Sequence, residues 1–232
     1  MTDWFRKTFW IGYTPFERLF LALMIMIQIT IFCIAPDNPL NLIAGVTGIV
    51  SSVLSSKGKV EFYFIGLIQI VAYMILAWQT RFYGVFFENV FYFITTTWCL
   101  FSWKKNLHTD EKGEKTVKVK KATPLMWVLS IVGVMVLTIV VGTVLDKIGS
   151  AQTYSDAATI VMSVLAQFLM IYRYREQWTW WIIVDLLCAK MWFVAGNLSM
   201  TVMCLAWTAN CIYGWWKWNK LNKDQNREKS DI

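Results

Sequence analysis

Long apolar segments follow one another along this chain, separated by short polar breaks. A helix needs about 20 mostly apolar residues to cross the hydrocarbon core of a bilayer. The segments are apolar almost throughout, without the alternation of a membrane β-strand, so helices are predicted. The pattern therefore predicts an all-α integral membrane protein in the lipid bilayer. Its eight expected spans lie at about 16–35, 41–56, 60–79, 82–103, 124–145, 153–172, 177–195 and 199–218.

Positive charge is unevenly divided between the two sides of these spans. Of the 22 Lys and Arg residues, only Arg81 and Lys147 fall in the loops of one side, and only Lys190 lies deep within a span. Cytoplasmic loops of membrane proteins carry an excess of Lys and Arg, so both termini are predicted to be cytoplasmic. The net charge of +7 is explained in this way without a nucleic-acid partner. The basic stretch 104–123 is predicted to be a solvated cytoplasmic loop.

The spans group as one, three, one and three. The segment 59–69, which leads into the second helix of the first triplet, resembles 175–185 in the second triplet. Each begins with charge, continues with aromatic and aliphatic residues, and reaches one buried polar residue. An odd linker helix gives the two triplets the same orientation, so a 3+1+3 core of parallel repeats is predicted, as in SWEET transporters. The expected domains are an N-terminal tail with an extra transmembrane helix (1–40), a first three-helix bundle (41–104), a basic loop with a linker helix (105–152), a second three-helix bundle (153–219) and a cytoplasmic tail (220–232).

Polar residues from both triplets are expected near the middle of the membrane. A charge at that depth costs at least about 2.5 kcal/mol, and such residues normally face a cavity or a partner. The pathway of a small solute is the interpretation we favour for the set, whereas interhelical hydrogen bonding is the alternative for any single Gln or Asn. The set comprises Gln69, Glu88, Asn89, Tyr92, Asp185 and Asn210.

Several of the 14 tryptophans extend this interpretation. Trp207 lies well inside its span, whereas Trp178 and Trp181 begin the helix that carries Asp185. Aromatic rings beside acids suit a flat organic cation, because the ring faces attract positive charge. Lys190 follows Asp185 by five residues, so it cannot share a helix face with this acid and is expected to reach outward or toward another helix.

Other chemistry finds little support in the sequence. The five cysteines form no CxxC pair, and His108, the only histidine, lies in the basic loop. No familiar catalytic motif occurs, so no enzyme activity, metal or cofactor is predicted. Gly45, Gly48 and Ser52 form a stripe of small residues, for which helix packing is the expected role.

Four sequence features together closely resemble the PnuC family of vitamin transporters, from about residue 41 to residue 220. A single WxxW or NxxY would be weak, but the ordered set is fairly specific. The features are the run Ser51–Lys59 before an aromatic-led helix, the NxxY of Asn89 and Tyr92, the WxxW of Trp178 and Trp181 after a charged turn, and the closing run Asn210–Trp218.

The resemblance implies uptake of nicotinamide riboside by facilitated diffusion across a bacterial inner membrane. It implies a substrate bound between the triplets, a homotrimer, and trapping of the product by cytosolic phosphorylation. Aromatic side chains would hold the pyridinium ring, amides would bond the carboxamide, and acids would bond ribose hydroxyls or oppose the charge. The site residues expected are Gln69, Glu88, Asn89, Tyr92, Trp178, Trp181, Asp185, Trp207 and Asn210.

Three alternatives remain open at this point. One is a proton-coupled carrier of a related vitamin such as thiamine or riboflavin, using Glu88 or Asp185. Another is an intramembrane enzyme, which would normally need an acidic metal-binding motif or a histidine. The third is a structural or sensor subunit, for which the midplane polar residues would be superfluous.

Overall fold

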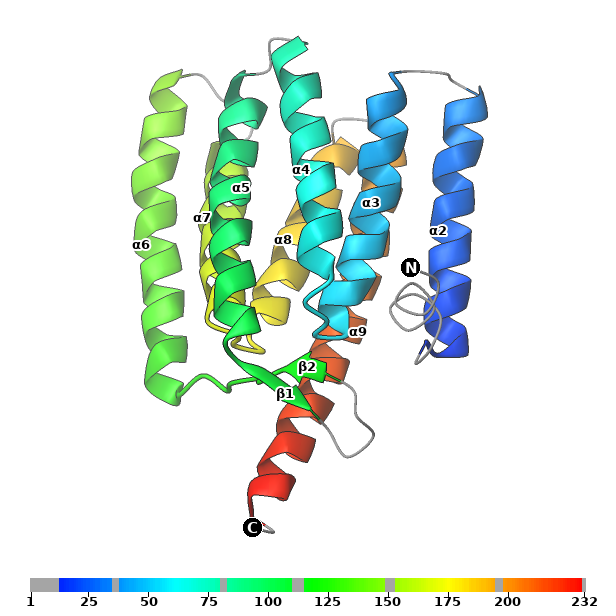
Figure 1. Ribbon diagram of the computed structural model, residues 1–232. Coiled ribbons are helices and arrows are strands. Elements are labelled where there is room, and N and C mark those ends of the chain that lie inside the picture. The colour runs from blue at the N-terminus through cyan, green and yellow to red at the C-terminus, as the bar shows by residue number, and fades with distance from the viewer. Residues whose placement is uncertain are drawn as a thin grey trace. The chain divides into compact units, whose positions relative to one another are not determined.

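The computed structural model describes residues 13–34, 38–79, 83–109, 115–148, 153–194 and 198–230 (Figure 1). Each of the eight expected spans coincides with one helix in these residues. Arg81 and most of the N-terminal tail lie outside the described residues. The helices are α2 (Pro15–Ile34), α3 (Pro39–Ser56), α4 (Phe62–Gln79), α5 (Tyr83–Lys104), α6 (Pro124–Ile148), α7 (Thr153–Ile171), α8 (Gln177–Val194) and α9 (Leu198–Ser230).

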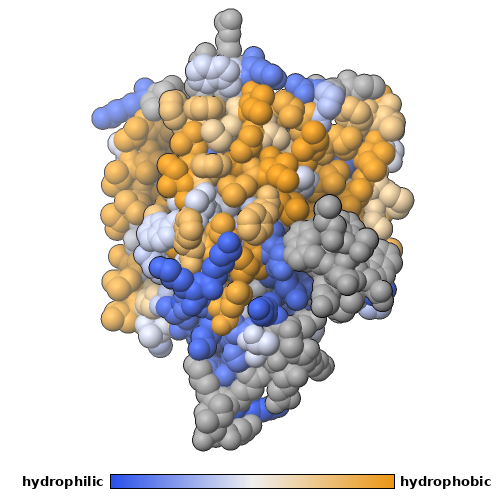
Figure 2. Space-filling model, viewed as in Figure 1, coloured by the Kyte–Doolittle hydropathy of each residue, from blue (hydrophilic) through white to orange (hydrophobic). Residues whose placement is uncertain are grey.

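Five of these helices, α2, α3, α4, α6 and α7, are long and apolar enough by themselves to cross a membrane. The other three carry most of the polar residues that the sequence places at the midplane, and these residues lower their mean hydropathy. Hydrophobic side chains dominate the helical part of the face shown in Figure 2. Hydrophilic side chains gather at the end where α9 continues to Ser230.

Residues Met1–Lys104 form one compact unit, in which α2, α3, α4 and α5 pack in chain order. An edge-to-face aromatic contact joins the start of α4 to the end of α5: the ring centroids of Phe62 and Trp103 lie 5.0 Å apart. The neighbouring Tyr63 hydroxyl donates to the Cys99 Sγ at 2.7 Å. All four side chains are buried, so this cluster fixes the start of α4 against the end of α5.

The N-terminal end of α2 is held by a capping box. The Thr14 amide donates to the Glu17 carboxylate at 2.7 Å, and the Glu17 amide donates to the Thr14 hydroxyl at 3.2 Å. Glu17 also pairs with Lys57, which follows α3, at 2.9 Å. The Lys57 ammonium lies 4.0 Å from the ring centroid of Tyr13, and burial raises the pKa of the Tyr13 hydroxyl above its usual range. The extra N-terminal helix is thereby joined to the end of α3 by a buried ion pair.

Residues Lys105–Ile232 form the second compact unit, in which α6, α7, α8 and α9 pack in chain order. Its core lies between α7 and α8, where Met162, Ala166 and Leu169 pack against Trp180 and Val184. An edge-to-face contact joins the start of α8 to α9, as in the first unit: the ring centroids of Trp178 and Trp218 lie 5.9 Å apart.

The chain makes the same kind of turn after α3 and after α7. After α3, the Gly58 and Lys59 amides donate to the Ser55 and Leu54 carbonyls. After α7, the Arg173 and Tyr174 amides donate to the Met170 and Leu169 carbonyls in the same pattern. Gly58 and Arg173 both adopt positive φ, at 67° and 66°. This is the Schellman helix end, which usually employs glycine.

The basic segment after α5 is more ordered than a solvated loop. Strands β1 (Leu107–Thr109) and β2 (Lys115–Val117) pair antiparallel. The chain beyond β2 then lies against α9, where the Gln225 amide bonds both the Val117 carbonyl at 3.0 Å and the Val119 amide at 2.9 Å. Asn222 donates to the Val119 carbonyl at 3.2 Å. Because these contacts require helix beyond the membrane, they explain why α9 continues well past its expected end near 218.

Candidate functional site

The second unit contains a buried acid on α8. Asp185 on α8 is only 8% exposed, and the Cys211 thiol of α9 donates to its Oδ2 at 3.4 Å. Asn210 precedes Cys211 and is 4% exposed. The Asp185 carboxylate accepts from the Cys211 thiol and retains acceptor capacity for a ligand donor or a positive charge. Two of the expected polar residues, Asp185 and Asn210, thus lie on helices that pack against each other, and Cys211, the neighbour of Asn210 in the chain, contacts Asp185.

The tryptophans of the second unit have different environments. Trp178 is buried, and it lies so close to α9 that a Cβ on Gly214 would come within 2.8 Å of its ring. Its ring therefore has a packing role, although its indole N–H has no hydrogen-bond partner among the described residues. Trp181 and Trp207 are half-buried. Trp181 lies one turn before Asp185, so the two share a face of α8.

In the first unit the polar residues come from α4 and α5. The Gln69 side chain lies against Gly48 of α3, where an added Cβ would be 2.9 Å from its amide nitrogen. Asn89 and Tyr92 are half-buried and one turn apart, so they share a face of α5, whereas Glu88 is exposed. Asn89 and Tyr92 are thus better placed than Glu88 to contact the same neighbouring group.

The small-residue stripe of α3 faces two different helices. A Cβ on Gly45 would lie 2.7 Å from the Gln28 side chain of α2, whereas Gly48 faces Gln69 of α4. Close packing is therefore confirmed for these two glycines. Further along α3, the Ser51 hydroxyl donates to the Phe62 carbonyl at 3.0 Å.

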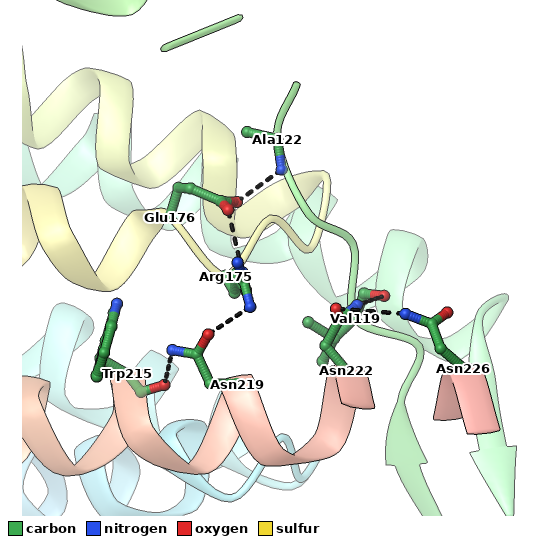
Figure 3. A network of polar contacts seen from close by, with 8 residues as sticks. All are labelled: Val119, Ala122, Arg175, Glu176, Trp215, Asn219, Asn222 and Asn226. Carbon is green, nitrogen blue, oxygen red and sulfur yellow. Dashed lines mark hydrogen bonds and ion pairs between the residues drawn. The ribbon is translucent and has the colours of Figure 1, made fainter. Parts of the chain in front are cut away.

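A polar network anchors the start of α8 in the second unit (Figure 3). Glu176 accepts from the Ala122 amide at 2.9 Å and from the Arg175 Nε at 3.1 Å. Arg175 also donates to Asn219 of α9. Arg173, which has a positive φ, is held by its neighbours: its carbonyl accepts from the Lys120 amide at 2.9 Å. The network holds the first turn of α8, and with it the WxxW motif, in place.

One buried residue of this turn was not among the site residues expected from the sequence. Gln177, the first residue of α8, is 1% exposed, and neither polar atom of its side chain has a partner among the described residues. The available signal was its spacing, because Gln177 precedes Trp181 by four residues and Asp185 by eight. Lys190 is exposed, in agreement with a side chain that points away from Asp185. Within the described part of the chain, no three His, Cys, Asp or Glu residues are grouped to hold a metal.

Comparison with known proteins identifies the family. The sequence profile described as "Nicotinamide mononucleotide transporter" matches residues 38–220. The chain belongs to this family. A "Nicotinamide riboside transporter PnuC" from Haemophilus influenzae is 36% identical over 95% of the chain and 97% of its own length. The protein of the same name from Neisseria mucosa is 34% identical over 95% of the chain and 87% of its own length.

A solved structure agrees with the sequence relatives. The chain matches "Crystal structure of the Vitamin B3 transporter PnuC" with a TM-score of 0.82 and 33% identity, over 96% of this chain and 98% of that one. The PnuC resemblance predicted from the NxxY and WxxW motifs is therefore confirmed. As a member of this transporter family with several apolar helices, the protein is a multi-pass membrane protein.

Proposed function

We propose that this protein takes up nicotinamide riboside by facilitated diffusion and that cytosolic phosphorylation traps the product. The observation that carries the proposal is the similarity to two nicotinamide riboside transporters along nearly the whole chain. The buried Asp185 supports it, because nicotinamide riboside has a cationic pyridinium ring that a carboxylate would offset. The same relatives favour a transporter over an intramembrane enzyme.

The riboside fits the midplane residues better than the mononucleotide that gives the family its name. A phosphate group would add negative charge beside Asp185, and like charges repel strongly where water is scarce. Lys190, the one cation expected deep in a span, is exposed and lies on another face of α8 from this acid. An uncharged ribose hydroxyl can instead donate to a carboxylate.

The proposed substrate contacts are the residues that the family resemblance implies. Asp185 would offset the ring charge, Trp181 and Trp207 would contact the ring, and Asn210 would bond the carboxamide or ribose. Gln69, Asn89 and Tyr92 would supply further hydrogen bonds. Glu88 would act at the edge of the site, and Trp178 through its indole N–H.

Equilibrium titration of the purified protein tests the proposed substrate. Nicotinamide riboside, nicotinamide mononucleotide, nicotinamide, thiamine and riboflavin would each be titrated by calorimetry. The riboside should bind at least about tenfold more tightly than the others, a difference of about 1.4 kcal/mol. Tighter binding of thiamine or riboflavin would reassign the substrate within the vitamins. Tighter binding of the mononucleotide would contradict the charge argument.

Alanine at Asn89 or at Asn210 is expected to weaken riboside binding. Each lost hydrogen bond to a buried polar group should cost roughly 1–3 kcal/mol, which is about a 5- to 150-fold loss of affinity. Calorimetry would measure it, and thermal unfolding would show that each variant is folded. Alanine at the exposed Asn226 is the control and should leave affinity unchanged. Unchanged affinity in both folded variants would reject the site.

Transport is expected to be uncoupled from protons and sodium. A cationic substrate gives Asp185 and Glu88 a simpler role than ion coupling. In proteoliposomes at zero membrane potential, internal riboside should rise only to the external concentration. The potential must be clamped, because a cation accumulates on voltage alone at about 2.3 kcal/mol per 100 mV. Uphill accumulation driven by a pH or sodium gradient would establish a symporter instead.

Both termini are expected to lie on the cytoplasmic side of the bacterial inner membrane, because Lys and Arg are concentrated in the loops of that side. A cysteine at the exposed Asn226, in a background without native cysteines, should resist an impermeant thiol reagent added to intact cells whose outer membrane is permeable to it. Labelling after the inner membrane is opened is the positive control. Rapid labelling of closed cells would reverse the topology.

The proposal includes the 3+1+3 arrangement of two parallel triplets and a homotrimer. The matching helix ends after α3 and α7, and the matching contacts of Phe62 with Trp103 and of Trp178 with Trp218, support the repeat. The homotrimer is an expectation from the family resemblance, and native mass spectrometry would measure the subunit number.

A further inference from the structure

Gln177 combines deep burial with an unpaired side-chain amide. It is 1% exposed, yet neither its Oε1 nor its Nε2 has a hydrogen-bond partner among the residues that the structure describes. Its backbone amide is satisfied, since it donates to the Tyr174 carbonyl at 3.2 Å. Burying both amide atoms without partners destabilises a protein, whereas leucine or methionine would fill similar space without that cost. A glutamine here therefore calls for a reason other than folding.

The surrounding polar groups do not supply that reason. The adjacent Glu176 is engaged by the Ala122 amide and by Arg175, and Arg175 in turn reaches Asn219 (Figure 3). This network anchors the first turn of α8 without the Gln177 side chain. The indole N–H of the neighbouring Trp178 is also buried and without a partner in the described residues. Unpaired hydrogen-bonding groups thus gather at a turn whose backbone is already fixed.

The position of Gln177 relates it to the candidate site. Gln177, Trp181 and Asp185 follow one another at intervals of four residues, so they form one stripe along α8. At a rise of 1.5 Å per residue, Gln177 lies about 12 Å from Asp185 along the helix axis. It lies at the end of the stripe next to Arg173 and Arg175, which is the expected cytoplasmic end.

We propose that Gln177 is a second substrate-contacting station, on the cytoplasmic side of Asp185, that bonds the carboxamide of nicotinamide riboside as the substrate enters or leaves the cytoplasm. This inference rests on the proposed function. A primary amide presents one acceptor and two donor hydrogens, and it pairs with a second primary amide through two reciprocal hydrogen bonds. A carboxylate in place of the carboxamide would lose the donor half of this pairing. Gln177 would therefore discriminate the carboxamide from the carboxylate of nicotinic acid riboside.

Gln177→Leu tests the station, because it removes both polar atoms at similar volume. In proteoliposomes, the rate of riboside exchange at saturating substrate should fall about tenfold or more, as expected for a lost buried hydrogen bond. The preference for nicotinamide riboside over nicotinic acid riboside should shrink in the same variant. Thermal stability should stay equal or rise, because the unpaired amide is gone. Gln177→Met should behave alike.

Gln167→Leu is the matched control. Gln167 is also buried, on α7 of the same unit, but unlike the Gln177 amide it belongs to a residue with a recorded interaction elsewhere in the protein. This change should lower stability and leave substrate preference unchanged. If Gln177→Leu keeps the wild-type exchange rate and the wild-type substrate preference, the proposed contact is wrong. A loss of thermal stability in both Gln177 variants would also overturn it, because that loss would show a structural role. Absence of riboside exchange by the wild-type protein would instead refute the proposed function itself.

Discussion

Replacing Lys57 with alanine is expected to destabilise the protein by about 3–5 kcal/mol, because it removes the cation that compensates a buried carboxylate. Lys57 is 4% exposed and Glu17 is 1% exposed, and their charged groups lie 2.9 Å apart. Lys57 also loses its contact with the Tyr13 ring. Unfolding by heat or by SDS titration in detergent would measure the loss, which should appear first in α2 because the pair joins this helix to the end of α3.

Two further variants separate the loss of the pair from the loss of any lysine. Lys105→Ala removes an exposed cation, and it should change stability by no more than about 0.5 kcal/mol. The double variant Glu17→Leu with Lys57→Met removes both charges, so it should recover most of the lost stability, as apolar replacements of buried ion pairs often do. A fully stable Lys57→Ala protein would show that Glu17 finds another partner or becomes protonated.

Asp185→Asn is expected to weaken nicotinamide riboside binding roughly 30-fold or more. Removing one partner of a buried charge pair typically costs about 2–5 kcal/mol, and 2 kcal/mol corresponds to about this factor. Asparagine has nearly the same shape and can still accept from the Cys211 thiol, so the contact between α8 and α9 should persist. Calorimetry with purified protein would measure the affinity, and thermal unfolding would verify the fold.

The charge argument has a ligand control. Reduced nicotinamide riboside keeps the carboxamide and ribose but has a neutral ring, so Asp185→Asn should weaken its binding less than about fivefold. Glu88→Gln is the matched variant in the other unit, and its effect should be smaller because Glu88 is exposed. Equal losses for the cationic and the neutral ligand would show that Asp185 bonds a hydroxyl and does not offset the ring charge.

The sequence alone was sufficient for the helices and the family. Every expected span has its helix, because crossing a bilayer requires a long apolar run that satisfies its own backbone hydrogen bonds. The ordered NxxY and WxxW motifs were specific enough for the PnuC resemblance. Both kinds of signal are local: each is contained within a short stretch of chain and needs no knowledge of which segments meet.

Contacts between distant segments were decided only by the tertiary structure. The basic segment after α5 was expected to be a solvated loop, but its Val117 and Val119 are buried and bonded to Asn222 and Gln225, more than 100 residues away. Residues 219–230 are strongly polar and gave no sign of a continued helix. They form one because Asn222 and Gln225 occupy one face of it, which the basic segment covers.

The roles of the buried polar residues were also decided by the tertiary structure. Glu17 and Lys57 are ordinary boundary charges in sequence, and packing of α2 against α3 makes them a buried pair. Gln177 follows a charged turn, Gln167 lies in an apolar helix, and both are buried; the structure leaves the side chain of Gln177 unpaired in the described residues. Sequence spacing determines which residues share a helix face. Burial and hydrogen-bond pairing depend on what the neighbouring helix places against that face, and residues far apart in the chain supply it.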